Sequence, residues 1–500
     1  MTFNSFTFLA CFALFYTVYV RLDFRRQNGL LLVASYLFYA VWDWRFLGLI
    51  LLSTAVDYTM ARTIAASQDE KKRLRCLWVS VVVNLGVLGF FKYFNFFLES
   101  AYQLLGLLGI PGLHWRLDLA LPVGISFYTF KTLSYTLDVY GRQMEPTHNF
   151  AHYAAFVAFF PQLLSGPIDR AATLLPQIQK PRRISTWHLQ AGIWLFLWGL
   201  CKKTVMADNL ALLVGPVFSN GPVSGSEAWF ALYAFAIQLY CDFSGYTDMA
   251  RGIAKLMGFE TSINFRQPYF TTNPMDFWKR WHISLTSWVQ DYLYIPIAAY
   301  YLRKGSGILN QYMPHVLTMG LIGLWHGASM NFVLFGVYWG VALALYASYR
   351  NGMKKRARRK RSATKAAASS PIETIRFILR LLAFFHVVCF SLVLFRAGSI
   401  AQALRYYRFL LGRGIAGPGG FADWLAMMHP MAWQGKMILF TAALVAVPLF
   451  LFEWAQARSG DELVVHRWPV PVQFAVYLAV WLALFMSGVR ENYGFIYVQF

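Results

Sequence analysis

Two histidines of this chain stand in settings where an imidazole could do chemistry. His326 lies in the run Leu-Ile-Gly-Leu-Trp-His-Gly-Ala-Ser-Met, inside an apolar stretch over 313–347 that is long enough to cross a bilayer. An ionisable side chain at membrane depth is costly unless it is paired or borders water, so it is a candidate functional residue. The alternative for a single such histidine is a hydrogen bond to a neighbouring helix. A second histidine, His282 in Trp-Lys-Arg-Trp-His-Ile-Ser-Leu, favours a functional site.

Large aromatic residues and cations precede His282 in the sequence. Trp278, Lys279, Arg280 and Trp281 come directly before it. This composition is typical of an element at the headgroup zone of a membrane, where aromatic rings and cations are both favoured. It also suits a pocket for a charged, partly apolar acyl donor, with cations for phosphate and rings for a base or an acyl chain. The residues alone leave both interpretations open.

A further group of polar residues lies within one apolar helix that we expect over 228–257. This group contains Asp242 and Ser244, and also Asp248 and Arg251, whose helical spacing indicates a local ion pair. Asp242 could fix the tautomer of a histidine or brace two helices, and bracing is the favoured interpretation.

The composition indicates a polytopic membrane protein. Hydrophobic residues make up 58% of the chain and charged residues only 14%, which leaves too little polar surface to coat a soluble globule of this size. The net charge of +22 is concentrated in part between residues 354 and 361. Such a run beside membrane helices predicts a cytoplasmic loop, over 350–370, that touches anionic lipid. Nucleic-acid binding is disfavoured because no module for it accompanies the basic run.

The hydrophobic pattern predicts an all-α fold of about ten or eleven transmembrane helices in a single domain over 1–500. Charge placement around the first helix puts the N-terminus outside. The segments at 101–110, 119–137 and 152–168 are interrupted by proline and glycine, so we expect re-entrant or interfacial pieces there. The helices are expected at 6–20, 30–41, 46–64, 76–97, 191–206, 228–257, 313–347, 377–395, 437–452 and 472–486.

Metal and disulfide chemistry are not indicated. The five cysteines are scattered without a Cys-x-x-Cys pair, so the sequence predicts neither a zinc site nor a disulfide framework. The glycine-rich segment 412–420 matches no phosphate-binding or dinucleotide motif and is expected to be a surface loop.

Several motifs in order along the chain resemble the membrane-bound O-acyltransferase family, in its bacterial branch of alginate-type O-acetyltransferases and, more distantly, teichoic acid D-alanyl transferases. They are the block 264–291 with its Phe-Trp-Lys-Arg-Trp-His-Ile-Ser-Leu core, Leu-Trp-His-Gly around His326, Leu-Pro-Val-Gly-Ile-Ser-Phe-Tyr-Thr-Phe from 121, Phe-Phe-Pro-Gln-Leu-Leu-Ser-Gly-Pro-Ile from 159, Tyr-Cys-Asp-Phe-Ser-Gly-Tyr-Thr-Asp-Met-Ala from 240, and Phe-Ile-Tyr-Val-Gln-Phe at the end.

The resemblance implies transmembrane and re-entrant helices around a central tunnel. It implies that His326 is the active-site histidine and His282 the second polar position of the site. Candidates to line the tunnel or the donor site are Trp278, Lys279, Arg280, Trp281, Asp242, Ser244 and Trp325. Acetyl-CoA is the implied acyl donor, with no bound cofactor. A separate periplasmic acetyltransferase with a serine hydrolase-like (SGNH) site and the polysaccharide biosynthesis machinery are the implied partners, in the inner membrane of a bacterium.

The chemistry can be argued from the residues themselves. Transfer of an acyl group from a thioester to a hydroxyl needs a base, and histidine is suited to that at neutral pH. His326 is therefore the expected general base, and His282 is expected to position the donor or polarise its carbonyl. The chain contains no Gly-x-Ser-x-Gly elbow, which favours direct transfer over an acyl-enzyme. D-alanyl transfer, a transporter and a non-enzymatic assembly protein stay as alternatives.

The position of His326 along the chain predicts its depth. A straight helix from His326 to Arg350 would extend about 36 Å at ~1.5 Å per residue, which exceeds a hydrocarbon core of about 30 Å. We therefore expect His326 to lie well away from the cytoplasmic basic side, unless the helix tilts or breaks at Gly323 or Gly327. A remote histidine with a cytoplasmic donor implies transfer across the membrane.

Overall fold

Helices account for all the regular structure that the computed structural model describes. The model describes residues 2–110, 116–222, 225–305, 307–359, 371–411 and 432–488. Within these ranges the elements are α-helices, short 3₁₀-helices and π-helical turns, with no strand. The all-α class predicted from the hydrophobic pattern is confirmed.

Two compact units make up the structure. Unit 1 comprises 1–200, 245–262 and 492–500, and unit 2 comprises 201–244 and 263–491. Each unit is described by itself, and the single domain expected over 1–500 stays a prediction.

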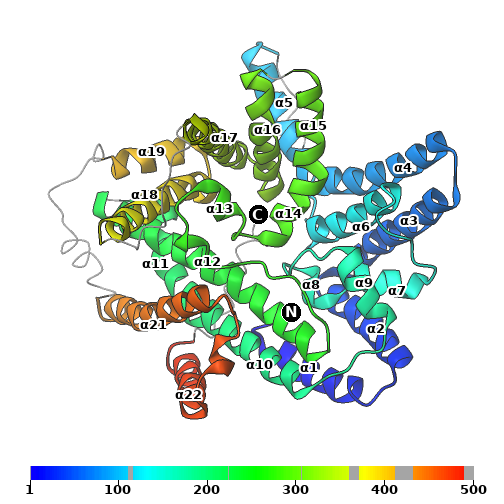
Figure 1. The fold of residues 1–500 in the computed structure, drawn as a ribbon, viewed down its shortest axis with the longest axis horizontal. Helices are drawn as coiled ribbons and strands as arrows, with labels where there is room; N and C mark the ends of the chain where they lie inside the picture. The colour runs from blue at the N-terminus through cyan, green and yellow to red at the C-terminus, as the bar shows by residue number, and fades with distance from the viewer. Residues whose placement is uncertain are drawn as a thin grey trace. The chain divides into compact units, whose positions relative to one another are not determined.

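Unit 1 contains the N-terminal helices (Figure 1). Helices α3, α4 and α6 pack against one another around the buried carboxylate of Asp57, which accepts a hydrogen bond from Asn84 Nδ2 at 2.7 Å. The helices of this unit are α1 (Phe6–Tyr19), α2 (Phe24–Asp43), α3 (Leu47–Ala66), α4 (Glu70–Leu88), α5 (Phe94–Leu107), α6 (Ile125–Tyr140), α7 (Phe150–Val157), α8 (Phe160–Leu163), α9 (Ala171–Gln179) and α10 (Thr186–Cys201), whose last residue opens unit 2.

A second buried polar cluster in unit 1 joins a cation to a carboxylate through an amide. Lys131 Nζ donates to Gln162 Oε1 at 3.0 Å, and Gln162 Nε2 donates to Asp169 Oδ2 at 2.5 Å. The other oxygen of Asp169 accepts from the backbone N–H of Ser262 at 3.0 Å. Gln162 lies on α8, so the break expected within 152–168 is present and places this amide between the two charges.

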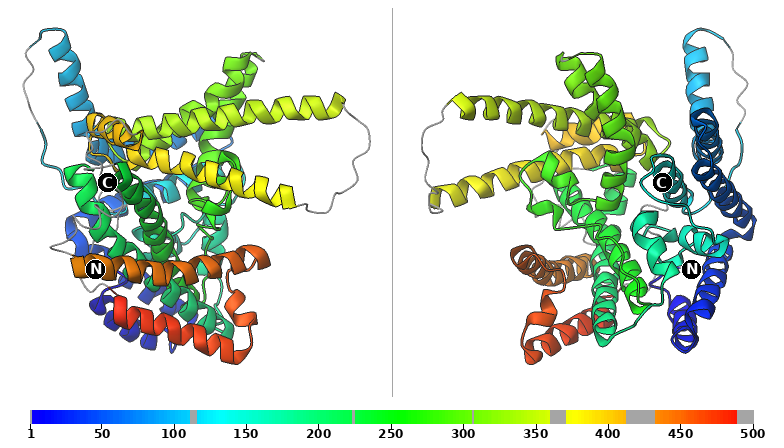
Figure 2. Two further views of the ribbon diagram at one scale, coloured as in Figure 1. Left: turned by 90° about the vertical axis from the view of Figure 1, so that its left-hand side faces the viewer. Right: turned by 45° about the vertical axis from the view of Figure 1, so that its right-hand side comes forward.

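Unit 2 contains the remaining helices. Helix α12 (Gly225–Leu256) begins in unit 2, and its residues from 245 onward belong to unit 1. The others are α11 (Asp208–Asn220), α13 (Pro274–Trp278), α14 (Ile283–Val289), α15 (Ile295–Arg303), α16 (Ile308–His326), α17 (Met330–Arg359), α18 (Pro371–Arg396), α19 (Ile400–Leu410), α21 (Ala432–Ser459) and α22 (Val470–Ser487). Helices α17 and α18 pack together along unit 2 (Figure 2).

The apolar stretch 313–347 is not one straight helix, and the break that was considered at Gly327 is present. It is an antiparallel hairpin of α16 and α17, because the chain turns at Gly327. The helices approach closely at Gly323 and Gly336, which we call the glycine contact. A β-carbon on Gly323 would overlap with the carbonyl oxygen of Phe332, and one on Gly336 with that of Met319. Small residues permit this approach, as is usual where helices meet in membranes.

Helix α17 continues into the basic run that was expected to be a loop. It ends at Arg359, so the residues from 350 to 359 are helical. Lysine, arginine and alanine are good helix formers, and the run from 353 to 359 contains neither glycine nor proline to stop the helix. The rest of the expected loop, 360–370, and the glycine-rich segment 412–420 lie outside the described residues, as does the C-terminal motif.

Five stretches among the described residues are long and apolar enough to cross a membrane. They are Phe24–Ala66, Glu70–Leu107, Met330–Met353, Ile372–Arg396 and Val470–Ser487. The first contains two helices, α2 and α3, of 20 residues each, and 20 residues match a hydrocarbon core of about 30 Å. The total of ten or eleven spans stays a prediction.

Candidate active site

His282 is the residue before α14 and is fully buried. Its backbone is left-handed, with φ 46° and ψ 55°, a conformation that is strained for any residue with a β-carbon. The segment around Asn264 holds it in place. Ile283 N donates to the backbone oxygen of Asn264 at 2.9 Å, and Arg266 N donates to the oxygen of Arg280 at 3.0 Å. The surrounding backbone thus fixes a strained histidine, a pattern that clusters at functional sites.

His326 is the last residue of α16 and is also buried, with 5% of its surface exposed. Its ring packs edge-on against Phe335 of α17, with ring centroids 5.8 Å apart, and against Phe395 of α18, at 5.3 Å. The turn that follows requires a glycine, because a β-carbon at Gly327 would overlap with the ring of Phe332. Three helices therefore determine where this imidazole lies.

Trp325 connects the two histidines. Its ring centroid lies 6.1 Å from that of His282 and 5.0 Å from that of His326. Phe243 of α12 closes another side of His282, with centroids 4.7 Å apart. Residues far apart in the sequence thus form one buried histidine pair, lined by aromatic rings.

The ring and cation residues before His282 separate into two groups. Trp278 and Trp281 are buried, and the ring of Trp281 packs against Phe265 at a centroid distance of 5.1 Å. Lys279 is exposed and Arg280 is half-buried. They occupy a short helix, α13, and the turn after it, rather than one continuous element. The two tryptophans are therefore part of the buried core of unit 2, whereas Lys279 is exposed.

Asp242 connects α12 to a neighbouring helical turn through an ion pair, as in the bracing interpretation favoured from the sequence. Lys203 lies in a π-helical turn, Lys202–Ala207, and its Nζ contacts Asp242 Oδ1 and Asp208 Oδ1, each at 2.7 Å. All three side chains are buried. We call this group the Lys203 cluster. The residue next to Asp242 on α12 is Phe243, so the cluster supports the helix that contacts His282.

Ser244 is buried on the same helix, and the predicted pair of Asp248 and Arg251 is present in unit 1 at 3.7 Å. Sequence reasoning missed Lys203, Asp208 and Asn264. The first two lie in or after an apolar run, where the contact of Lys203 with Asp242 has no local signature. Asn264 opens the motif block 264–291, but its contact with the start of α14 spans 20 residues and has no local signature either.

Neither a metal site nor a disulfide is present in the part of the chain that the structure describes. No group of three or more histidine, cysteine or carboxylate side chains there could hold a metal ion. All five cysteines are free.

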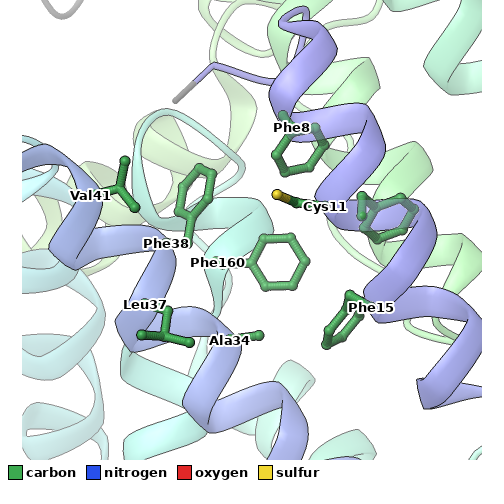
Figure 3. A pocket seen from close by; sticks show the side chains of 9 residues that line it. Phe8, Cys11, Phe15, Ala34, Leu37, Phe38, Val41 and Phe160 are labelled. Atoms are coloured by element: carbon green, nitrogen blue, oxygen red, sulfur yellow. The ribbon is translucent and has the colours of Figure 1, made fainter.

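A separate apolar cavity of about 260 Å³ lies in unit 1, between α1 and α2 (Figure 3). Phe160 projects into it from α8, and Phe8, Phe15 and Phe38 line its walls. Leu37 and Val41 on its rim are largely exposed, which fits a surface in contact with lipid. With no ionisable partner except a free cysteine, Cys11, the cavity has no group suited to acyl transfer.

Comparison with known proteins identifies the family. The model of the MBOAT, membrane-bound O-acyltransferase, family matches residues 36–390, a range that contains both histidines. A probable alginate O-acetylase of Azotobacter vinelandii is 37% identical over 85% of this chain and 79% of its own length. A peptidoglycan O-acetyltransferase of Helicobacter pylori is 32% identical over 76% of this chain and 73% of its own.

More distant is the teichoic acid D-alanyltransferase of Bacillus subtilis, 28% identical over 55% of this chain and 68% of its own. The family match covers more than half of the chain, and it agrees with the all-α fold and the apolar helices long enough to span a membrane. The chain is therefore a multi-pass membrane protein and an O-acyltransferase that belongs to the membrane-bound O-acyltransferase family.

Proposed function

We propose that this enzyme takes an acetyl group from acetyl-CoA on the cytoplasmic side and passes it across the membrane for O-acetylation of an extracellular polysaccharide such as alginate. Relatives named as probable alginate O-acetylases, 37% to 40% identical over most of the chain, support the acetyl group and the polymer. The observation that carries the proposal is the buried histidine pair around Trp325 inside the family's matched range.

The proposed reaction assigns a role to each histidine. His326 accepts the proton of the acceptor hydroxyl as its oxygen attacks the thioester carbonyl carbon. The carbon–sulfur bond then breaks, and the proton passes from His326 to the leaving thiolate. His282 positions the donor or polarises its carbonyl, and transfer is direct, without an acyl-enzyme. The aromatic walls of Trp325, Phe335 and Phe395 keep water away from the thioester.

The cellular setting is part of the same proposal. We place the protein in the inner membrane, with the N-terminus outside and the basic region 350–370 in the cytoplasm, where it contacts anionic lipid. A separate periplasmic protein with a serine hydrolase-like site receives the acetyl group and hands it to the polymer together with the polysaccharide biosynthesis machinery. The candidate donor residues Trp278, Trp281, Trp325, Arg280 and Lys279 remain proposals, of which exposed Lys279 fits least.

The alternative acyl group is D-alanyl, transferred to a wall polymer. It has support from the Bacillus subtilis relative, but at 28% identity over a smaller share of the chain. Membership of an acyltransferase family disfavours a transporter or a non-enzymatic assembly protein.

Acetyl transfer by purified protein in liposomes tests the function. Labelled acetyl-CoA is supplied with a candidate acceptor, and wild type is compared with His326→Ala and His282→Ala. We expect His326→Ala to lower the rate about 10²- to 10⁴-fold, the usual contribution of a general base. His315→Ala is the matched control, because His315 lies on the same helix and its Nε2 is 3.2 Å from the hydroxyl of Tyr294.

The outcomes separate the proposals. Full activity of correctly folded His326→Ala protein would remove His326 as the base. Label trapped covalently on the chain after addition of the donor alone would replace direct transfer by an acyl-enzyme. Transfer of D-alanyl from a carrier thioester, without transfer from acetyl-CoA, would favour the alternative.

A further inference from the structure

Helix α14 begins without a side-chain cap from the residue that precedes it. His282 occupies the N-cap position, yet its side chain accepts no hydrogen bond from the helix. Asn264 supplies the caps from a distant segment. Its backbone oxygen accepts from Ile283 N at 2.9 Å, and its side-chain Oδ1 accepts from Ser284 N at 3.1 Å. These bonds satisfy two of the N–H groups that the start of a helix leaves exposed.

The backbone N–H of Ser284 determines the orientation of the Asn264 amide. The two ends of an asparagine side chain are nearly alike in shape, and their assignment rests on the hydrogen bonds they make. A backbone N–H can only donate, so the atom that faces it must be the carbonyl oxygen. The hydroxyl of Ser284 donates to the same oxygen at 2.8 Å.

The ring of His282 meets this same oxygen. His282 Nδ1 lies 3.1 Å from Asn264 Oδ1. If Nδ1 of His282 were unprotonated, its lone pair would face the lone pairs of Asn264 Oδ1, and no hydrogen bond could form. Nδ1 must therefore carry a hydrogen and donate it to Asn264 Oδ1. In the neutral imidazole Nε2 then holds the lone pair. We propose that Asn264 is a positioning residue that fixes His282 in the tautomer with Nδ1 protonated and the acceptor lone pair on Nε2.

This inference rests on the proposed function and narrows the role of His282 within it. Polarising a thioester carbonyl requires a hydrogen-bond donor, which Nε2 of this tautomer cannot be. A lone pair on Nε2 can instead hold an N–H or O–H group of the donor or acceptor in place. Of the two roles considered for His282, positioning of a substrate group is the one that the tautomer permits.

Nitrogen chemical shifts of His282 report the tautomer directly. The full chain, with ¹⁵N-labelled histidine, is studied in lipid bilayers by solid-state NMR at pH 8, and the spectrum of His282→Gln assigns the His282 signals. We expect a protonated Nδ1 and an unprotonated Nε2 in the wild type. Asn264→Asp, which keeps an acceptor at this place, should retain that pattern, and Asn264→Leu should lose it.

Kinetics with labelled acetyl-CoA as the probe provide the second readout. Removal of a partner that orients a functional histidine through its other nitrogen typically costs about 10- to 100-fold, and we expect that loss of kcat for Asn264→Leu. Asn264→Asp should restore most of the rate. Ser284→Ala is the matched control, because it removes only the hydroxyl that shares the oxygen and should stay close to the wild type.

Failure of this inference differs from failure of the proposed function. An unprotonated Nδ1 in active wild-type protein overturns the role of Asn264 and leaves acyl transfer standing. The expected tautomer together with full activity of His282→Gln overturns the role of His282 in the reaction. If Asn264→Leu does not fold, the wild-type spectrum and the Asn264→Asp variant still decide, because loss of the tautomer or of the rate in Asn264→Asp contradicts the inference.

Discussion

The Lys203 cluster and the histidine pair are both buried polar regions of unit 2, but the protein stabilises them in different ways. Lys203 is enclosed by two carboxylates, each 2.7 Å away, so a fixed positive charge is met by opposite charge. His282 and His326 are instead enclosed by rings, among them Trp325, Phe243 and Phe395. A neutral imidazole needs no counter-ion in such surroundings, whereas an ammonium group does.

Buried polar residues in this protein differ in role according to how they are stabilised. Unit 1 repeats the first solution, where Gln162 links the ammonium of Lys131 to the carboxylate of Asp169. Clusters with matched charges hold helices together. An imidazole, by contrast, is the side chain whose ordinary pKa lets it accept and release a proton near neutral pH. We therefore assign structure to the charged clusters and chemistry to the histidine pair.

Replacement of Lys203 by methionine has the largest expected effect on stability. Methionine fills a similar volume but leaves the buried carboxylates of Asp208 and Asp242 without their cation, a loss that typically costs about 3–5 kcal/mol. The purified variant in detergent should unfold at a clearly lower temperature than the wild type. Arg467→Met is the control, because Arg467, which pairs with Asp461 in the same unit, is itself mostly exposed and should matter little. An unchanged unfolding temperature for Lys203→Met would contradict the structural role assigned to the Lys203 cluster.

Gly336→Ala should have an intermediate effect and should act on the position of His326. The added β-carbon overlaps with the carbonyl oxygen of Met319, so α16 and α17 must move apart, at a cost of about 1–3 kcal/mol. We expect a lower unfolding temperature together with a reduced rate of acetyl transfer. Gly86→Ala on α4 is the control, since its β-carbon would meet nothing within 4 Å and alanine favours a helix. Equal behaviour of the two variants would contradict the close contact.

His326→Gln has the smallest expected effect on stability. Glutamine is polar and similar in size, so we expect a change of about 1 kcal/mol or less, as for substitutions without a buried charge or a large void. Thermal unfolding in detergent and the acetyl-transfer assay are measured on the same sample. A fall in unfolding temperature as large as that of Lys203→Met would place His326 with the structural clusters instead.

Long apolar helices were predictable from the sequence, and their interruptions were predictable only in part. The expected helices at 6–20, 228–257 and 472–486 match α1, α12 and α22 closely, because hydrophobicity and length define them. A break at Gly327 was considered within 313–347, but the antiparallel return of α17 along α16 was not, since the turn depends on a packing contact between Gly327 and Phe332. Hydropathy does not register such a contact.

The two histidines of the site were predictable from motifs, and their supports were only partly so. Trp325 was singled out with them and does lie against both. Lys203 and Asn264 were missed because each acts across the fold, on a carboxylate and on a helix start that are remote in sequence. The tryptophans and cations before His282 look alike in sequence, and only burial separates them.

The glycine contact affects how the enzyme responds to the lipid or detergent around it. It brings the α-carbons of Gly323 and Gly336 against carbonyl oxygens of the facing helix, the geometry of weak C–H···O hydrogen bonds. Lipid tails can replace apolar side chains in packing against a helix, but they cannot donate a hydrogen bond to a carbonyl oxygen. Polar contacts of this kind therefore still stabilise helix association in hydrocarbon. The position of His326 should consequently be the same in thick and thin bilayers and in detergent. Variation of activity with lipid composition would then originate elsewhere in the protein.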